Sequence, residues 1–227
     1  MFPRLRVYPS LPLSATMVGT VDALLPLSLL EAVRAVDRPV VDPETEFVAE
    51  LRNKRLGLSD TVHAQIRRYG EAVRRSQRLG VDEAIALARL IARRPDAEAV
   101  FRVAGEYFAE QAYGALPSTT RRIVRRLPGL IARPLALRQL RRLARRYFAG
   151  TVARAGTSLV LEVPSPITVT DAAPSVGCAY YESGLRVLLR LLVGADGAVE
   201  HVHCVDRAGG RCQWRAEWWR PHTEHRA

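Results

Sequence analysis

The sequence predicts an α+β fold in which an antiparallel sheet packs with helices and an α-helical N-terminal region precedes it. Apolar residues recur at helical spacing through most of the first 150 residues, whereas β-branched runs follow Gly150. The chain has 227 residues, enough for one sizeable domain with a helical extension. Its 48% hydrophobic and 25% charged residues are ordinary for a globular protein that buries a core.

The first part of the chain is predicted to be helical after an irregular, proline-punctuated lead over residues 1–20, with a short extended piece at 18–21. Helices are expected over 25–36, from Asp42 to Gly57, from Ser59 or Asp60 to Gly80, and from Asp82 to Pro95. Asp42 and Ser59 are good N-cap residues, and a proline follows Asp42 at the first helical position. We therefore predict that residues 1–95 form a helical N-terminal region.

Residues 96–150 are predicted to form further helices that become rich in arginine. One helix begins at Asp96, and Ser118 caps the next, which Pro128 and Pro134 interrupt. The last helix places an apolar stripe on one side, namely Leu137, Leu140, Ala144 and Tyr147, and fills the rest with Arg138, Arg141, Arg142, Arg145 and Arg146.

This basic face is typical of the solvated side of a helix that packs on a core. The functional alternatives are an anionic membrane surface or a nucleic-acid backbone. Nucleic acid ranks last because the sequence has no helix-turn-helix signature and no ladder of aromatic residues for base stacking.

The sheet is predicted from the remaining residues up to 219. Strands are expected over 157–163, 167–170, 198–205 and 211–219, with a helix from Cys178 to Val193 and a Gly209-Gly210 loop before the last strand. In that strand Cys212, Trp214, Ala216 and Trp218 share one face. Residues 96–219 thus form the predicted sheet-containing domain, and 220–227 form a tail.

All three cysteines fall in this C-terminal part, in the pattern C-x22-H-x2-C-x7-C formed by Cys178, His201, Cys204 and Cys212. Thiolates with an imidazole suit tetrahedral zinc, which has no open position for a substrate once four ligands fill it. We therefore expect a structural zinc site. The alternative is a set of three buried free thiols, since cysteine packs well as a small hydrophobe. The odd number of cysteines argues against a disulfide framework.

The spacing of His201 and Cys204 raises a geometric question. Side chains in a regular strand alternate between faces, so these two residues would point to opposite sides. Either a turn or β-bulge intervenes, or the fourth ligand is Glu200 or His203.

Residues of about 176–218 resemble the C-terminal part of the 4-vinyl reductase domain family, through the stretches Gly177–Leu185, Val199–Val205 and Gly210–Arg215. The family includes bacteriochlorophyll 4-vinyl reductase-like proteins and the aromatic-sensing domains of sigma-54-dependent activators. It is similar in fold to subunits of the transport protein particle. The aromatic sensors hold zinc with one glutamate and three cysteines. By position, these ligands become Cys178, His201, Cys204 and Cys212, with His201 in place of the glutamate.

Our first hypothesis is that residues 96–219 form a non-catalytic, zinc-stabilised binding domain, because a closed metal site has no position for a substrate. Members of the 4-vinyl reductase domain family bind hydrophobic ligands between sheet and helices, so we expect a small molecule of the tetrapyrrole or aromatic type. The pocket candidates are Tyr107, Phe108, Tyr180 and Tyr181, whose alternative role is simple core packing. The resemblance also implies a homodimer.

Two other functions stay open. The chain could act as an enzyme or accessory factor of bacteriochlorophyll synthesis, or as an adaptor at an anionic membrane surface. Catalysis is disfavoured because the sequence has no Rossmann glycine fingerprint, no P-loop and no nucleophile–base pair. The formal charge of +11 favours anionic partners. Without a membrane-length apolar run or a signal peptide, we expect a cytoplasmic protein.

Overall fold

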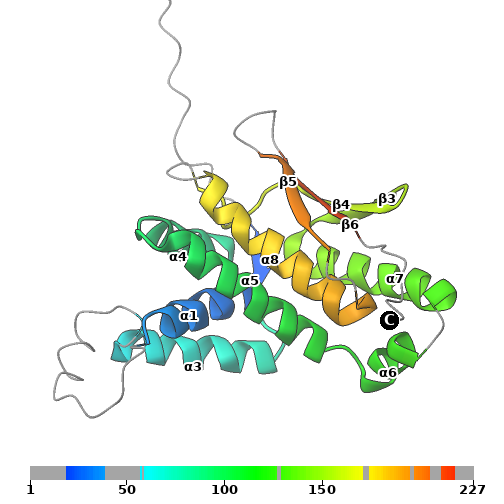
Figure 1. Ribbon diagram of the computed structural model, residues 1–227. Helices are drawn as coiled ribbons and strands as arrows, with labels where there is room; N and C mark the ends of the chain where they lie inside the picture. Colours follow the sequence, from blue (N-terminus) through cyan, green and yellow to red (C-terminus); the bar gives the residue numbers. More distant parts are fainter. Residues whose placement is uncertain are drawn as a thin grey trace, which may run out of the picture.

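The computed structural model describes residues 19–38, 57, 59–126, 129–170, 174–194, 197–204 and 211–217. The described chain combines helices with a two-stranded and a four-stranded antiparallel sheet, which confirms the predicted α+β fold (Figure 1). In the described part of the chain, no helix is both long and apolar enough to cross a membrane.

The N-terminal elements largely follow the sequence prediction. They are β1 (Thr20–Asp22), α1 (Leu24–Val36), α3 (Asp60–Arg74), β2 (Arg78–Gly80) and α4 (Val81–Ala92). Of the two residues predicted to cap α3, Ser59 and Asp60, Ser59 is the cap, because its hydroxyl accepts a hydrogen bond of 3.3 Å from the backbone N–H of Val62. The helix expected from Asp42 lies outside the described residues.

The prediction that the third helix runs to Gly80 is wrong. The helix ends at Arg74, and Ser76 takes a φ of 52°, in the left-handed region that helices do not enter. Residues 78–80 instead pair with 20–22 as an antiparallel strand. The Arg78 side chain reinforces this pairing by donating to the Thr20 hydroxyl at 2.8 Å and to the Thr20 carbonyl at 2.6 Å. Pairing with a strand that is distant in the sequence therefore overrides the helical preference of residues 78–80.

Helices α5 (Ala97–Gly114) and α8 (Pro174–Val193) cross at the centre of the molecule (Figure 1). A Cβ atom at Gly105 would overlap the Ser183 hydroxyl and the Tyr180 carbonyl oxygen, so only glycine allows this approach. The Ser183 hydroxyl bridges the two helices, since it lies 2.8 Å from the Arg102 carbonyl of α5 and 2.9 Å from the Ala179 carbonyl of α8.

The arginine-rich segment forms α6 (Ser118–Arg126) and α7 (Gly129–Phe148). The expected interruption at Pro134 is wrong, because α7 continues through it. Pro134 lies in the second turn, where it removes one backbone hydrogen bond, to the Leu130 carbonyl. The turns that follow offset this loss by burying an apolar stripe that includes Ala136, Leu140, Leu143, Ala144 and Tyr147. Pro128 lies outside the described residues.

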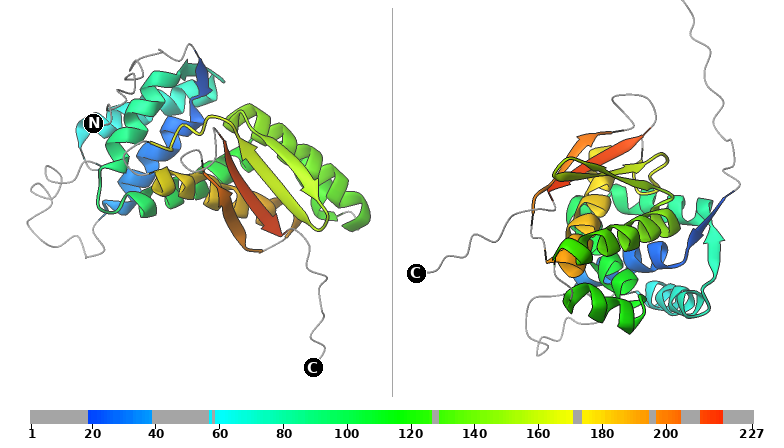
Figure 2. Two further views of the ribbon diagram at one scale, coloured as in Figure 1. Left: turned by 90° about the horizontal axis from the view of Figure 1, so that it is seen from above. Right: turned by 90° about the vertical axis from the view of Figure 1, so that its right-hand side faces the viewer.

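The larger sheet contains β3 (Thr151–Ala155), β4 (Ser158–Val163), β5 (Val199–His203) and β6 (Cys212–Glu217) in the order β3-β4-β6-β5. One face of the sheet is buried against α7 and α8, as both views in Figure 2 show. The side chains on this face include Leu159, Leu161 and Val163 of β4 and Cys212, Trp214 and Ala216 of β6. The alternation predicted for the last strand is therefore confirmed over 212–217; Trp218 lies outside the described residues.

The strand predicted over 167–170 is wrong, and β3 was not predicted. Residues 167–170 form a loop that packs against α8. The Ile167 N–H donates to the Tyr181 hydroxyl at 2.9 Å, and the Thr168 hydroxyl donates to the Gly177 carbonyl at 2.7 Å. The loop thus satisfies its polar groups with the helix instead of a neighbouring strand.

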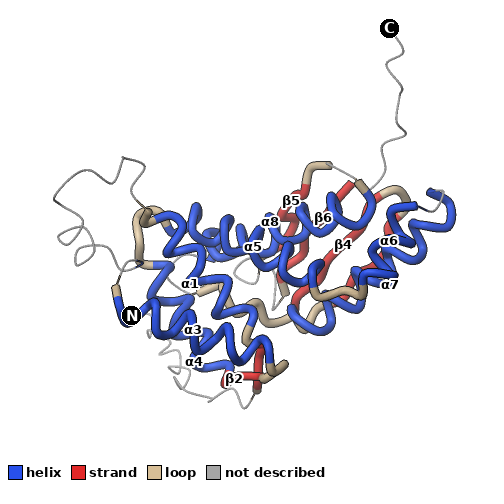
Figure 3. The backbone as a smooth tube through the Cα atoms, turned by 90° about the horizontal axis from the view of Figure 1, so that it is seen from below, coloured by secondary structure: helices blue, strands red, loops and turns tan. Residues whose placement is uncertain are grey.

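A single cluster of buried side chains extends from Val21 to Ala216. It joins the N-terminal helices to α5, α8 and the four-stranded sheet. Figure 3 shows these helices and strands from below the view of Figure 1. The described parts of the regions 1–95 and 96–219 therefore share one core, and their division into two units stays a prediction.

The helix crossing leads to a stability prediction. We expect Gly105→Ala to lower the free energy of unfolding by about 1–3 kcal/mol, because the added methyl group forces α5 and α8 apart. The control is Gly114→Ala at the end of the same helix, where a Cβ atom meets nothing within 4 Å. This change should leave stability unchanged or raise it by up to about 1 kcal/mol. Urea denaturation of both variants measures the difference, and equal stabilities would contradict the role of the crossing.

Candidate metal centre

Four side chains that are distant in the sequence meet beside the sheet. The ligand atoms of Cys178, His201, Cys204 and Cys212 all lie within 4.8 Å of one another. Cys178 comes from the first turns of α8, His201 from β5, Cys204 from the residue after β5, and Cys212 from the start of β6. The structure therefore brings together all four residues that the sequence pattern singled out, in a group that could hold a metal ion.

The distances between the sulfur atoms fit coordination of a shared ion. The Sγ atom of Cys204 lies 3.9 Å from that of Cys178 and 3.8 Å from that of Cys212. A disulfide bond would bring two sulfurs to about 2.05 Å. Tetrahedral coordination with metal–sulfur bonds of about 2.3 Å places two sulfurs about 3.8 Å apart. The observed spacing matches the second geometry.

A β-bulge lets His201 and Cys204 reach the same side. In the pairing of β5 with β6, His201 faces Trp214 and His203 faces Gln213, so Val202 is the extra residue. The bulge reverses the normal alternation after His201. Of the two alternatives that the sequence left open, the structure shows the first, an irregularity between His201 and Cys204.

The two alternative ligands, Glu200 and His203, are exposed and do not belong to the cluster. Glu200 instead lies at the register position opposite Arg215 of β6. His201 is therefore the fourth member of the group that the structure assembles.

The imidazole of His201 is held in one orientation. Its ring stacks on the indole of Trp214, with centroids 5.2 Å apart and an angle of 20° between the planes. Trp214 is fully buried, and its ring also packs against that of Tyr181, with the ring centroids 4.9 Å apart. The Nε2 atom of His201 is buried and has no hydrogen-bond partner among the described residues. A buried nitrogen without a partner is costly, and a bound metal ion would remove that cost.

The first turns of α8 are fixed against the 167–170 loop. A Cβ atom at Gly177 would overlap the carbonyl oxygen of Thr168, so the backbones touch directly beside Cys178. The Thr168 hydroxyl adds the hydrogen bond to the Gly177 carbonyl described above. Cys212 is fixed from the other side by its register position opposite Val163.

The environment of the thiols favours a bound cation. All three cysteines are buried, and Cys212 is 0% exposed. The hydrogen bond with Cys212, and then burial, raise the pKa of the Cys178 thiol well above its ordinary value. A metal ion supplies the positive charge that stabilises thiolates in such surroundings. With four ligands in place the site is closed, which suits a structural role.

Three of the four pocket candidates lie in a buried aromatic cluster beside the metal centre. Phe108, Tyr180 and Tyr181 pack with Tyr147, Phe148 and Trp214, and ring centroids of neighbouring pairs are 4.8–6.1 Å apart. Phe108, Tyr180 and Tyr181 are no more than 1% exposed. Tyr107 is half-buried at the edge of the core. Assignment of these residues to a ligand pocket stays a prediction.

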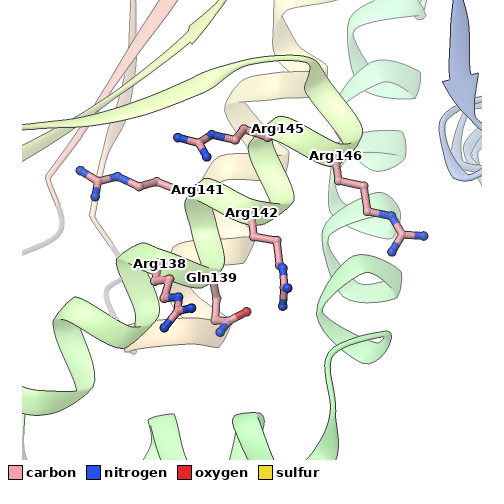
Figure 4. Close-up of a pocket in the computed structure, with 6 residues that line it drawn as sticks. All are labelled: Arg138, Gln139, Arg141, Arg142, Arg145 and Arg146. Carbon is pink, nitrogen blue, oxygen red and sulfur yellow. The ribbon is translucent and has the colours of Figure 1, made fainter.

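The structure also contains two arginine-lined cavities. One, of about 490 Å³, lies along α7 and is lined by Arg138, Gln139, Arg141, Arg142, Arg145 and Arg146 (Figure 4). The second, of similar volume, lies at α6 and is lined by Tyr113, Ser118, Arg121, Arg122 and Arg126. The sequence indicated a basic face on these helices, but helical periodicity alone does not reveal that the face is hollowed.

The choice of His201 over its neighbours can be tested by metal analysis. We expect His201→Ala to lower the metal content of the purified protein well below one ion per chain, because one of four ligands is lost. The matched control is His203→Ala, two residues away on the exposed side of the bulge, which should keep the wild-type metal content. The measurement is elemental analysis, and a loss of metal in His203→Ala alone would contradict the assignment.

Comparison of the chain with models of known protein families, with curated proteins and with solved structures finds no match. The resemblance of residues 176–218 to the 4-vinyl reductase domain family therefore stays an expectation from the sequence. The functional argument starts from the geometry of the cluster itself.

Proposed function

We propose that this chain is a non-catalytic binding domain stabilised by one structural zinc ion, and that its ligand is a hydrophobic small molecule. The observation that carries the proposal is the cluster of three cysteine sulfurs and one imidazole nitrogen, all within 4.8 Å of one another. Zinc is the ion that this ligand set suits best, because thiolate and imidazole ligands in tetrahedral geometry are its usual structural environment.

The zinc ion would join a helix to two neighbouring strands of the sheet. It would tie the start of α8 to the end of β5 and the start of β6. These are the elements that place Trp214 and Tyr181 against the aromatic core. Metal binding would therefore hold the sheet against the helices, and the energy of binding would contribute directly to folding.

A closed site also supports a non-catalytic role for the metal. Three thiolates and one imidazole fill the four positions of a tetrahedral zinc ion, so neither water nor substrate can coordinate it without displacing a ligand. The cluster is also largely buried, since its cysteines are at most 8% exposed.

The proposed ligand belongs to the aromatic or tetrapyrrole type. Aromatic side chains from α5, α7, α8 and β6 converge between the helices and the sheet, a composition that suits a flat apolar molecule. The half-buried Tyr107 lies at the edge of the core, and the proposal places it in contact with the ligand. The resemblance to the 4-vinyl reductase domain family supports the same ligand class. Homodimerisation stays a prediction.

Removal and return of the metal tests the zinc clamp. With free zinc at about a thousand times its Kd, binding should stabilise the folded protein by about 4 kcal/mol. We therefore expect a strong chelator to lower the melting temperature, and stoichiometric zinc, but not magnesium, to restore it. Cys204→Ser should melt near the chelated wild type and respond little to zinc, because it lacks one thiolate. A wild-type protein that purifies without zinc and melts unchanged in chelator would refute the clamp.

Titration with protoporphyrin IX tests the ligand class separately. We expect one porphyrin to bind per chain and to quench tryptophan fluorescence, since Trp214 belongs to the aromatic cluster. Tyr107→Ala should weaken binding by about tenfold, the equivalent of about 1.4 kcal/mol of lost contact. Tyr113→Ala, on the same helix and also half-buried, is the control and should bind as the wild type does. Zinc binding without any porphyrin binding would leave the clamp intact and exclude the tetrapyrrole.

A further inference from the structure

The positive charge of this protein is concentrated in one segment. Residues 111–161 contain eleven arginines and no aspartate or glutamate. The whole chain has 34 basic and 23 acidic residues, so the rest of it has 23 of each and no net charge. The net charge of +11 therefore belongs to the segment that forms α6, α7 and β3.

Five arginines of this segment form a stripe on α7. Arg138, Arg141, Arg142, Arg145 and Arg146 are spaced at i, i+3, i+4, i+7 and i+8, which places them on one side of the helix. All five are exposed, whereas the opposite side of α7 is buried in the core. Like charges at these spacings repel one another and destabilise a helix. An anion bound to the stripe would offset this repulsion.

Most of the stripe is not neutralised by the residues that the structure describes. Arg146 lies 3.4 Å from the Asp22 carboxylate, and Arg141 donates to the Val152 carbonyl at 3.0 Å. Among the residues that the structure describes, no carboxylate lies within ion-pair distance of Arg138, Arg142 or Arg145. Their guanidinium groups keep their full capacity to donate hydrogen bonds to a ligand.

The stripe borders a cavity and is not a flat surface. The cavity of about 490 Å³ is lined by the five arginines and by Gln139, which is only 9% exposed. Figure 4 shows that Arg138, Gln139 and Arg142 point to the same side of α7. The volume falls within the range of about 300–1,000 Å³ that is usual for small-molecule sites.

Arg121, which lines the second arginine-lined cavity at α6, carries an unsatisfied hydrogen-bond donor among the described residues. The Nε atom of Arg121 is buried and has no hydrogen-bond partner among the described residues, although its guanidinium lies 5.8 Å from the centroid of the Tyr113 ring. An unsatisfied buried donor is costly, and an anionic oxygen would satisfy it. This independent observation on the neighbouring helix points to the same ligand chemistry.

We propose that the α7 cavity binds a small polyanion with at least two phosphate or carboxylate groups. Arginines one helical turn apart are separated by about 5.4 Å along the axis, which allows two neighbouring anionic groups to be held at once. The residues that line the cavity include no aromatic ring for base stacking and no large apolar side chain for insertion into a bilayer. A small molecule therefore fits this site better than nucleic acid or a membrane. The proposal is independent of the zinc site and of the hydrophobic ligand.

Calorimetric titration of the full chain with inorganic triphosphate and with citrate tests this proposal. We expect at least one of them to bind in a 1:1 ratio, more weakly as salt increases. The double variant Arg138→Gln/Arg142→Gln should weaken binding by at least about tenfold, because it removes two bidentate donors. The exposed arginines that it removes have no acidic partner among the described residues, so its melting temperature should not fall.

The matched control is Arg67→Gln/Arg89→Gln on α3 and α4, which removes the same charge from exposed positions far along the chain. It should change affinity by less than about twofold. The single variant Arg142→Lys keeps the charge but loses bidentate geometry, and it should weaken binding to an intermediate degree.

Binding of triphosphate alone would identify phosphate as the recognised group, and binding of citrate alone would identify carboxylate. Three results would overturn the proposal: no binding of either probe at low salt, equal weakening in both double variants, or binding only to phosphatidylserine vesicles or single-stranded DNA. Both probes also chelate zinc, but the arginine variants keep all four residues of the cysteine–histidine cluster, so heat from zinc chelation is the same in each of them. A difference between the variants therefore reports on the α7 cavity alone, and failure here is distinguishable from failure of the proposed zinc-stabilised function.

Discussion

The close crossing of α5 and α8 is the constraint on which the rest of the structure depends. Gly105 lets the two backbones touch, and the Ser183 hydroxyl links them. This contact fixes α8, which carries Cys178 to the candidate metal centre and Tyr180 and Tyr181 to the aromatic core. The other side of α5 receives α1, so the N-terminal helices depend on the same contact (Figure 1). A side chain at the crossing would move Cys178 and the aromatic core together.

Trp214 contacts both the candidate metal centre and the aromatic core. Its indole stacks on the imidazole of His201 on one side and packs against Tyr181 of α8 on the other. A zinc ion at the cluster would therefore fix the wall of the apolar region as well as the β5–β6 hairpin. The arginine stripe uses the opposite, exposed side of α7, away from these buried rings. Apolar and anionic ligands would thus meet different surfaces of the same helix layer.

The errors of the sequence prediction share one cause. Residues 78–80 continue a helical pattern but pair with β1, and residues 167–170 have strand composition but bind α8 through Thr168 and Tyr181. In both places a partner distant in the sequence satisfies the backbone, and local propensity is too weak to compete. Pro134 was wrongly expected to interrupt α7, because the tertiary burial of the later turns outweighs the one backbone hydrogen bond that is lost.

The sequence by itself determined the α+β class, most helix positions, the alternation of the last strand and the residues that form the metal cluster. These features follow from periodicity, capping and ligand chemistry, which are local or depend on residue type alone. Only the tertiary structure decided that His201, and not Glu200 or His203, joins the three cysteines, because that choice depends on a bulge in the pairing of β5 with β6. The tertiary structure also decided that the arginine face borders a cavity and that few carboxylates among the described residues neutralise it. Both features arise only when distant segments pack together.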